Sequence, residues 1–156
     1  MLRVSQKLEY SMRAMIELAL RERDGVLVPA RAIADAQQIP LRFLEQQLGT
    51  LHKAGLVDSH RGAGGGCRLA RPADRIRMAD IADAIEGPFY PMGCLDAADH
   101  TCFADAHCGL QELWGDVYGA IRRVFEETSI ATLAERHRKL ATGIPLFAPA
   151  ELIRPR

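Results

Sequence analysis

Apolar residues recur every three to four positions through the first third of the chain, and this period predicts three amphipathic helices. The first is expected over about residues 5–22 and the second over about residues 29–38. The third is expected over about residues 41–54, and it stops at Gly55, a residue that accepts the left-handed conformation found at many helix ends. Only the break at Ile39–Pro40 separates the second helix from the third, so the pattern predicts two helices joined by a tight turn.

The pattern changes to short strands after the third helix. Residues 56–61 and 67–70 are strand-like, and they flank four glycines within the five residues 62–66. Because glycine adopts a positive φ without steric cost, this run predicts the turn of a β-hairpin. A short helix is expected over residues 78–86, stopped by Gly87-Pro88. The order helix, turn, helix and hairpin is that of a winged helix-turn-helix domain.

A longer helix is expected over about residues 109–128. Five apolar side chains repeat along it at three-to-four spacing, as in a helix that packs along another helix: Leu110, Leu113, Val117, Ile121 and Val124. A further helix is expected over residues 130–139, followed by an irregular, proline-bearing tail. The predicted fold class is therefore mainly α with a small β-hairpin.

The charges are distributed unevenly along the chain. The 156 residues carry 20 basic and 20 acidic side chains, so the net charge is zero. Residues 42–77 nevertheless have a net charge of +4, whereas residues 78–112 have a net charge of −7. A local basic segment favours phosphate binding whatever the overall balance. The N-terminus does not resemble a signal peptide, and no apolar run is long enough to span a membrane, so we expect a cytoplasmic protein with reduced thiols.

The third predicted helix carries side chains that can read DNA. Its inner stripe is Leu44, Leu48 and Leu51, which leaves four side chains facing outward: Arg42, Glu45, Gln46 and Thr50. In the major groove arginine donates to guanine, glutamine pairs with adenine and glutamate accepts from cytosine. Arg61, at the hairpin, is expected to enter a minor groove or bind phosphate. Contacts to the DNA backbone are expected from Lys53, His52, His60 and Arg68. The alternative is an ordinary solvated helix face, but the glycine hairpin favours DNA binding.

Three of the four cysteines lie in a loop without apolar period, at residues 89–108. Cys94, Cys102 and Cys108 follow the spacing C-x₇-C-x₅-C, and thiolates are soft ligands suited to iron–sulfur clusters or zinc. Zinc sites usually bring cysteines in CxxC pairs, which are missing from this sequence. The acidic loop also lacks the positive charge that activates a reactive thiol. A metal site is favoured over buried structural cysteines, while for Cys67 on the hairpin a structural role is expected and a redox thiol is the alternative.

These motifs resemble those of a known family, the IscR-type winged-helix iron–sulfur transcription regulators, which include IscR, NsrR and RirA. The segments that carry the resemblance are Phe43–Gln46, Lys53–Val57, Arg61–Leu69, Ala79–Ile81, Ala84–Pro88, Leu113-Trp114 and the cysteine loop. The similarity spans roughly residues 2–139, and it departs from the family at Cys67, where tyrosine is usual. In the family, the outer face of the third helix and the wing arginine contact operator DNA. By matching position, this implies such contacts for Arg42, Glu45, Gln46 and Arg61.

The resemblance also implies a [2Fe–2S] or [4Fe–4S] cluster held by the three loop cysteines. IscR completes its site with a histidine three residues after the last cysteine, but Gln111 stands at that position here. In other members a carboxylate near the N-terminus of the partner subunit is the fourth ligand, and the matching residue is Glu9. We therefore expect Glu9 of the partner subunit to complete the site, ahead of His107 and His100. The seven-residue first gap resembles that of the iron-responsive branch.

The family's organisation implies a homodimer that binds a palindromic double-stranded DNA operator. Operator binding would be controlled by the cluster, which senses redox state, nitric oxide or iron and cluster status. No membrane and no small-molecule substrate are expected. The expected division is a winged helix-turn-helix domain, a cluster-binding loop, a dimerisation helix with a following short helix, and a tail, at residues 1–88, 89–108, 109–140 and 141–156 respectively.

Three competing functions remain at this point. The first is a cluster-free winged-helix regulator that uses zinc or thiol chemistry. The second is an iron–sulfur electron carrier, and the third is a domain that binds another protein. An enzyme is not expected, because no Ser-His-Asp group, nucleotide-binding loop or pair of catalytic carboxylates can be assigned.

Overall fold

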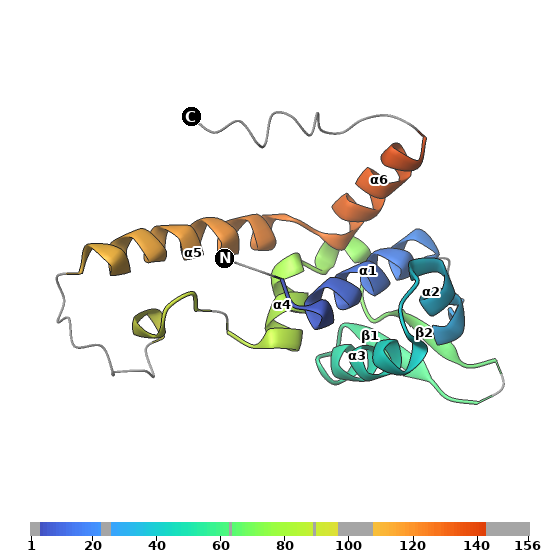
Figure 1. The fold of residues 1–156 in the computed structure, drawn as a ribbon. Helices are drawn as coiled ribbons and strands as arrows, with labels where there is room; N and C mark the ends of the chain where they lie inside the picture. The colour runs from blue at the N-terminus through green and yellow to red at the C-terminus, as the bar shows by residue number, and fades with distance from the viewer. Residues whose placement is uncertain (1–3, 23–25, 63, 89, 97–107, 143–156) are drawn as a thin grey trace.

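The structure is a computed structural model that describes residues 4–22, 26–62, 64–88, 90–96 and 108–142. In chain order the described elements are α1 (Gln6–Leu20), α2 (Ala30–Gln37), α3 (Leu41–Lys53), β1 (Val57–His60), β2 (Gly66–Leu69), the 3₁₀ turn η1 (Ala73–Arg75), α4 (Met78–Glu86), the 3₁₀ turn η2 (Gly93–Leu95), α5 (Gly109–Glu127) and α6 (Ile130–Ala141). A mainly helical chain with one two-stranded hairpin confirms the predicted fold class. In Figure 1, α1–α4, α6 and the hairpin form a body from which α5 extends as an arm.

The helix boundaries agree with the sequence pattern to within two residues. The largest differences are at the end of α1, which stops at Leu20, and at the end of α6, which continues to Ala141. The tail expected from residue 141 therefore begins slightly later, and residues 143–156 lie outside the described part of the chain. No helix among the described residues has the length and apolar character needed to cross a membrane.

Helix α1 lies at the centre of the body, because α2, α3, α4 and α6 all pack against it. Its Leu18 is buried in the same cluster as Ile33 of α2. The predicted inner stripe of α3 is confirmed, since Leu44, Leu48 and Leu51 are each at most 4% exposed. Burying an aliphatic side chain of this size contributes about 1.5–3 kcal/mol. This core therefore fixes the orientation of α3 and leaves its opposite face in solvent.

The turn between α2 and α3 is tight. Helix α2 ends at Gln38, whose φ of 53° is the left-handed conformation that glycine usually supplies at a helix end. The next residue, Ile39, is buried, and its N–H donates to the carbonyl of Ala34 over 2.9 Å. Pro40 then precedes the first residue of α3 and restricts the entry of the chain into that helix. These three residues set the angle between the two helices.

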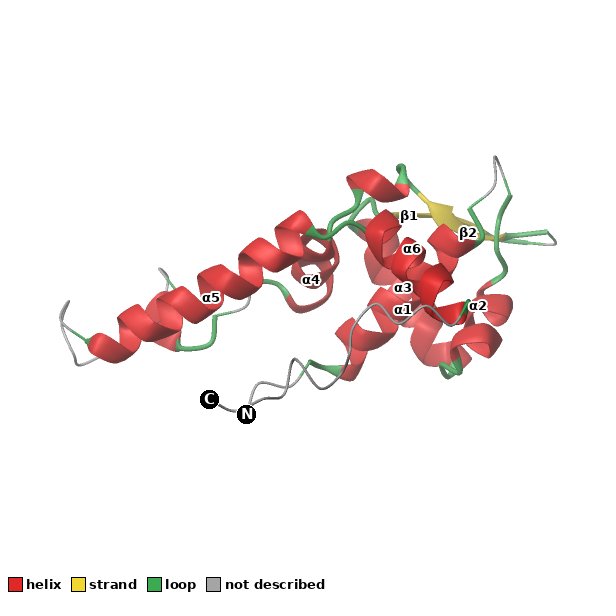
Figure 2. Cartoon of the chain, turned by 90° about the horizontal axis from the view of Figure 1, so that it is seen from above, coloured by secondary structure: helices red, strands yellow, loops and turns green. Residues whose placement is uncertain are grey.

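The hairpin of β1 and β2, which we call the wing, is joined directly to the segment before α2. Strands β1 and β2 pair antiparallel, with His60 opposite Gly66 next to the turn. Cys67 of β2 also pairs with Val28, and each residue donates its N–H to the other's carbonyl over 2.8 Å. A Cβ on Gly66 would lie 2.6 Å from the Val28 carbonyl oxygen, so the close approach requires glycine. Figure 2 shows the hairpin on the body, far from the tip of α5.

Within the described chain, helix α5 is attached to the body near its C-terminal end. The segment after it pairs with the segment before α4, where Met78 N–H donates to Thr128 and Ile130 N–H donates to Ile76, each over 2.9 Å. Arg122 of α5 adds an ion pair with Asp83 of α4. None of the 19 residues of α5 is buried. The arm is thus fixed at its base and uncovered along most of its length.

Candidate nucleic-acid interface and cysteine site

The outer face of α3 presents the side chains that the sequence assigned to DNA reading. Arg42, Glu45 and Gln46 are all exposed, on the face opposite the buried leucine stripe. Among the described residues, the side chains of these three make no ion pair or hydrogen bond. Their charged and amide groups are therefore free to contact base edges, which is the arrangement of a helix that enters the major groove.

Thr50 and Lys53 lie toward the C-terminal end of the same helix. Thr50 is half-buried, and its hydroxyl donates to the backbone carbonyl of Gln46 over 3.3 Å. Lys53 is exposed in the last turn of α3. A hydroxyl already bonded to its own helix is less available for base reading, so Arg42, Glu45 and Gln46 are the stronger base-reading candidates.

The wing carries two arginines in different electrostatic situations. Arg61 is exposed at the hairpin turn, beside Gly62, whose φ is 102°. Arg68 of β2 instead forms an ion pair of 3.2 Å with Asp58 on the paired strand. Because the Asp58 carboxylate already neutralises Arg68, a phosphate group would have to compete for that guanidinium. Arg61 is therefore the better phosphate or minor-groove contact.

A hollow of about 720 Å³ separates α3 from the wing. It is lined by side chains of both elements and of the segment before α2, among them Pro29, Glu45, Leu48, His52, His60, Arg61 and Cys67. The Nδ1 of His52 lies 2.8 Å from the Val57 carbonyl oxygen. Since a carbonyl only accepts, Nδ1 carries the proton and the His52 ring is fixed beside the wing. The hollow is thus part of the surface that α3 and the wing present together.

Cys67 is part of β2, and it is only 4% exposed. Burial raises the pKa of the Cys67 thiol, and the nearby hydroxyl of Ser59 opposes that rise only in part. A thiol with a raised pKa is mostly protonated near neutral pH and reacts slowly. These properties fit the structural role expected for Cys67.

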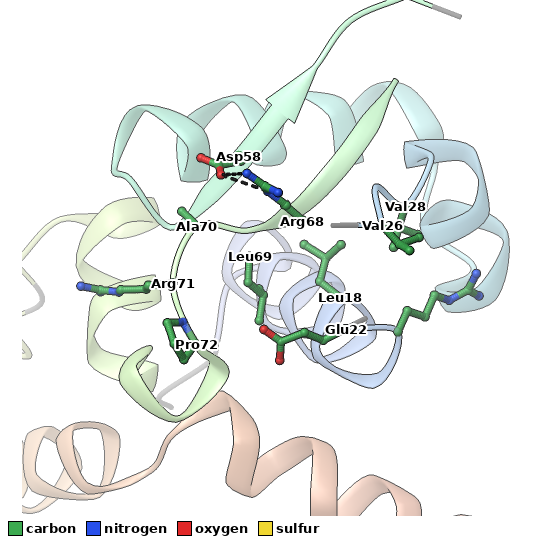
Figure 3. Close-up of a pocket in the computed structure, with 11 residues that line it drawn as sticks. Leu18, Glu22, Val26, Val28, Asp58, Arg68, Leu69, Ala70, Arg71 and Pro72 are labelled. Carbon is green, nitrogen blue, oxygen red and sulfur yellow. Dashed lines mark hydrogen bonds and ion pairs between the residues drawn. The ribbon is translucent and has the colours of Figure 1, made fainter. Parts of the chain in front are cut away.

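A smaller hollow of about 250 Å³ lies on the opposite face of the hairpin (Figure 3). Figure 3 shows the ion pair between Asp58 and Arg68 at its edge, with Leu18 and Leu69 below. Arg71 also lines it and is paired with Asp80 over 2.9 Å. Among the described residues, each arginine at this hollow is paired with a carboxylate, so an anion would have to compete for it.

Two of the three loop cysteines lie close to the start of α5. Cys94 belongs to η2, and Cys108 immediately precedes the first residue of α5. Gln111 connects them, because its backbone N–H donates to the Cys108 carbonyl over 3.0 Å and its side-chain amide donates to the Cys94 carbonyl over 3.4 Å. Leu95 packs against the helix at Gly115. Both thiols are partly exposed and neither is in a disulfide.

The third cysteine of the predicted set, Cys102, and the rival ligands His100 and His107 lie outside the described residues. Within the part of the chain that the structure describes, no three His, Cys, Asp or Glu side chains gather closely enough to hold a metal ion. Glu9 is in the first turn of α1, 54% exposed and paired with Arg13. In Figure 1, α1 lies in the body while η2 and the start of α5 lie toward the far end of the arm. One chain alone does not bring Glu9 to its own Cys94.

Two features of the site have no clear signal in the sequence. The first is the hydrogen bond from the Gln111 side-chain amide to the Cys94 carbonyl, which we call the tether. It joins residues 17 positions apart and follows from no local pattern. The second is an apolar groove of about 420 Å³ at the base of α5, formed where that helix meets α1 and α4. It is lined by Val4, Leu8, Tyr90, Tyr118, Ile121, Phe125 and neighbouring residues. The apolar repeat of α5 predicts an apolar face on that helix. Only the structure shows that the groove adjoins this face, through Ile121.

Comparison with known proteins identifies relatives over almost the whole chain. The sequence pattern that defines the Rrf2 family, described as an iron-dependent transcriptional regulator, matches residues 4–136. The HTH-type transcriptional regulator IscR of Cereibacter sphaeroides is 43% identical over 146 residues, which are 92% of this chain and 94% of that protein. The HTH-type transcriptional regulator CymR of Bacillus subtilis is 33% identical over 133 residues, 85% of this chain and 90% of that protein.

Solved structures of such regulators have the same fold. CymR, the global cysteine regulator of B. subtilis, matches with a TM-score of 0.74 at 33% identity and covers 87% of this chain and 98% of that one. T. potens IscR matches with a TM-score of 0.72 at 28% identity and covers 98% of this chain and 97% of that one. The similarity therefore extends beyond the winged-helix body into the arm, and it confirms the resemblance that the wing and the cysteine loop carry in the sequence.

Proposed function

Because the chain belongs to the Rrf2 family of transcriptional regulators, we propose that it binds a palindromic operator as a homodimer under the control of an iron–sulfur cluster. The chain is a transcriptional regulator and not an enzyme. The finer proposal has three parts, which are the DNA-reading surface, the dimer and the cluster. A single observation carries it: two cysteines of the predicted ligand set, Cys94 and Cys108, both accept hydrogen bonds from Gln111 at their backbone carbonyls, at the start of a largely uncovered arm.

The DNA contacts are assigned to α3 and the wing. Arg42, Glu45 and Gln46 would contact base edges, supported by their exposure and their lack of other partners in the described chain. Arg61 would contact a minor groove or a phosphate, since its guanidinium is exposed beside the glycine turn. Phosphate contacts release counterions, so operator affinity should fall steeply with salt concentration.

The dimer is assigned to α5. Leu110 and Leu113 are 56% and 55% exposed, and Val124 is 55% exposed. Uncovered apolar side chains along one helix favour association with a second copy about a two-fold axis. Two reading helices related by such an axis can face successive major grooves of a palindrome. The apolar groove at the base of α5 would receive part of the partner's arm.

We further propose that the two arms pair antiparallel, which would bring Glu9 of one chain to the cysteines of the other. In such a pair, the N-terminal end of one α5 lies beside the C-terminal half of the other. That C-terminal half lies across a shared groove from the start of α1, because Leu8, Ile121 and Phe125 line one groove. Cys108 of the partner subunit would therefore lie near the first turn of α1, where Glu9 is exposed. His107 and His100 remain rival ligands.

The proposed cysteine ligands suit an iron–sulfur cluster better than a weakly bound metal ion at the protein surface. Cys94 and Cys108 offer soft thiolates, and the tether of Gln111 holds their backbones near each other before any metal is bound. An iron–sulfur cluster supplies a redox- and oxygen-sensitive centre when bound. A carboxylate ligand bonds iron more weakly than a thiolate does. Glu9 would therefore be the ligand that exchanges most easily, which would make the cluster sensitive to oxygen and redox state. The thiolates of Cys94, Cys102 and Cys108 would retain the iron.

The decisive experiment is purification without oxygen, followed by the visible absorption spectrum with iron and sulfide analysis. We expect a coloured protein, loss of colour in Cys94→Ala and retention in Cys67→Ala, because Cys67 is not in the loop. We expect Glu9→Ala to change the spectrum or shorten its lifetime in oxygen, whereas Glu135→Ala, at an equally exposed ion-paired glutamate of α6, leaves both unchanged. A colourless protein that cannot be reconstituted would refute the cluster.

A second candidate is a cluster-free regulator that uses thiol or zinc chemistry. It is favoured by the structural similarity to CymR, whose function is cysteine regulation. The same purification separates the two candidates. Iron-free protein whose operator affinity responds to thiol oxidation or to zinc would establish the second one.

A further inference from the structure

The base of the arm is anchored to the body by backbone pairing. The segment 128–130, directly after α5, pairs with the segment 76–78, which leads into α4. The N–H groups of Met78 and Ile130 each donate across this pairing over 2.9 Å. Ser129 and Ile130 are at most 4% exposed, so this end of the arm is held in the core. The anchor fixes where the arm meets the body, and contacts further along α5 must fix the direction of that helix.

Arg122 supplies such a contact seven residues before Ser129, which is about 10 Å along the helix. Its Nη1 lies 2.6 Å from Asp83 Oδ1 of α4. Its Nε lies 2.7 Å from Glu126 Oε1, one turn later on α5. A guanidinium presents its donors in a rigid planar fork, so the bond to Glu126 also orients the nitrogen that reaches Asp83. Arg122 is therefore a brace between the arm and α4, set at a distance from the anchor.

Helix α4 connects this brace to the DNA-reading helix. It packs against both α1 and α3. Its Ile81, two residues before Asp83, is fully buried in the cluster that also contains Leu44 of α3. Because protein interiors are close-packed and resist deformation, α4 and α3 keep their relative orientation when a surface contact changes. The angle between α5 and α4 therefore sets the angle between the arm and the reading helix.

This angle has a consequence in the proposed dimer, where the two arms form the common centre and each carries one body. A different angle between arm and body gives a different separation of the two reading helices, and that separation must match the spacing of the half-sites on DNA. We propose that Arg122, braced on Asp83, is a specificity-determining residue that sets the half-site spacing preferred by the dimer. The inference rests on the proposed dimer and palindrome, whereas the contacts that carry it lie within one chain.

The expected effect is a loss of selectivity between spacings and not a general loss of binding. On DNA with the wrong spacing, the bodies must rotate against the arms, and this rotation breaks the pair between Arg122 and Asp83. The two side chains are 35% and 43% exposed, and ion pairs of this kind shift an equilibrium by about two- to fivefold. Arg122→Ala should therefore lower the preference for the best spacing by about that factor for each pair that the wrong spacing breaks. The affinity for the best spacing should change less.

The test uses palindromic duplexes built from a half-site that the wild-type protein selects from a random DNA pool. Affinity is measured for spacings from two base pairs shorter to two longer, at one salt concentration and equal iron content. Arg123→Ala is the matched control, because it removes the same charge from the next position of α5, and Arg123 is exposed and forms no ion pair among the described residues.

We expect Arg122→Ala to flatten the spacing profile and Arg123→Ala to leave it unchanged. Arg122→Asp and Asp83→Arg should each flatten the profile, and the double variant should recover it, because the attraction returns with its signs exchanged. An unchanged profile in Arg122→Ala, an equal change in Arg123→Ala, or no recovery in the double variant overturns the proposal.

Sedimentation of each variant and the selected DNA separate this inference from the proposed function. A wild-type protein that is monomeric, or that selects isolated half-sites, overturns the proposed dimer on a palindrome and this inference with it. A dimer that selects a palindrome, but whose spacing profile does not depend on Arg122, overturns only the inference.

Discussion

The close approach of the wing to the start of α2 makes a sharp prediction at Gly66. In Gly66→Ala the new Cβ would lie 2.6 Å from the Val28 carbonyl oxygen and 2.7 Å from the carbonyl carbon. Both are backbone atoms, so no side-chain rotation relieves the overlap. Either β2 moves away from Val28 or the pairing between Cys67 and Val28 is lost. Overpacking of this kind costs about 1–3 kcal/mol, and we expect a loss of that size in the free energy of unfolding.

The assay is urea unfolding followed by circular dichroism at one protein concentration, because the proposed dimer would make stability depend on concentration. Gly49→Ala in α3 is the matched control. A Cβ at Gly49 has no neighbour within 4 Å, and replacing a helical glycine by alanine stabilises by about 0.5–1 kcal/mol. The two substitutions should therefore move the midpoint in opposite directions. A Gly66→Ala protein as stable as the wild type would refute the claim that the wing is fixed to Val28.

Three further predictions concern the arm, the cysteine turn and the wing. Leu113→Asp should convert the dimer to a monomer in sedimentation, because it puts a charge on the uncovered face of α5; an unchanged dimer would place the interface elsewhere. Gln111→Ala should shorten the lifetime of the cluster in oxygen, since the tether to Cys94 is lost, whereas Glu112→Ala in the same turn should not; equal lifetimes would rule out the tether. Arg61→Ala should weaken operator binding and lower its salt slope by about 1, with a smaller effect for Arg68→Ala because Arg68 is already paired; the reverse order would contradict the ranking of the wing arginines.

The sequence predicts the elements well because their local signals are strong. Leu44, Leu48 and Leu51 repeat at helical spacing, and they are the residues that become buried. The glycines around residue 64 predict the hairpin turn, and the positive φ of Gly62 and Gly64 explains why they are needed. Both signals act over a few residues, so they can be read without knowledge of the fold.

The sequence does not predict contacts between distant elements. Nothing near Arg13 indicates that its guanidinium donates to the backbone carbonyl of Gln37, at the end of α2 and 24 residues later. The neutralisation of Arg68 depends on the strand register that sets Asp58 opposite it. For the candidate cluster site, the cysteine spacing predicts the type of ligand. The proposed fourth ligand, Glu9 of the partner subunit, would depend on how two chains pair, which no local pattern encodes.

The attachment of α5 at one end makes it a lever. At 1.5 Å per residue its 19 residues span about 28 Å, so a tilt of roughly 5° about the base moves the cysteine end by about 2.5 Å. Conversely, a small displacement of Cys94 and Cys108 would rotate the arm about its base. Arg122 and Thr128 join the arm to α4 at that base. In a two-fold dimer both bodies rotate together. Because the two half-sites on DNA have a fixed spacing, such a rotation would make both reading helices fit their major grooves, or miss them, at the same time.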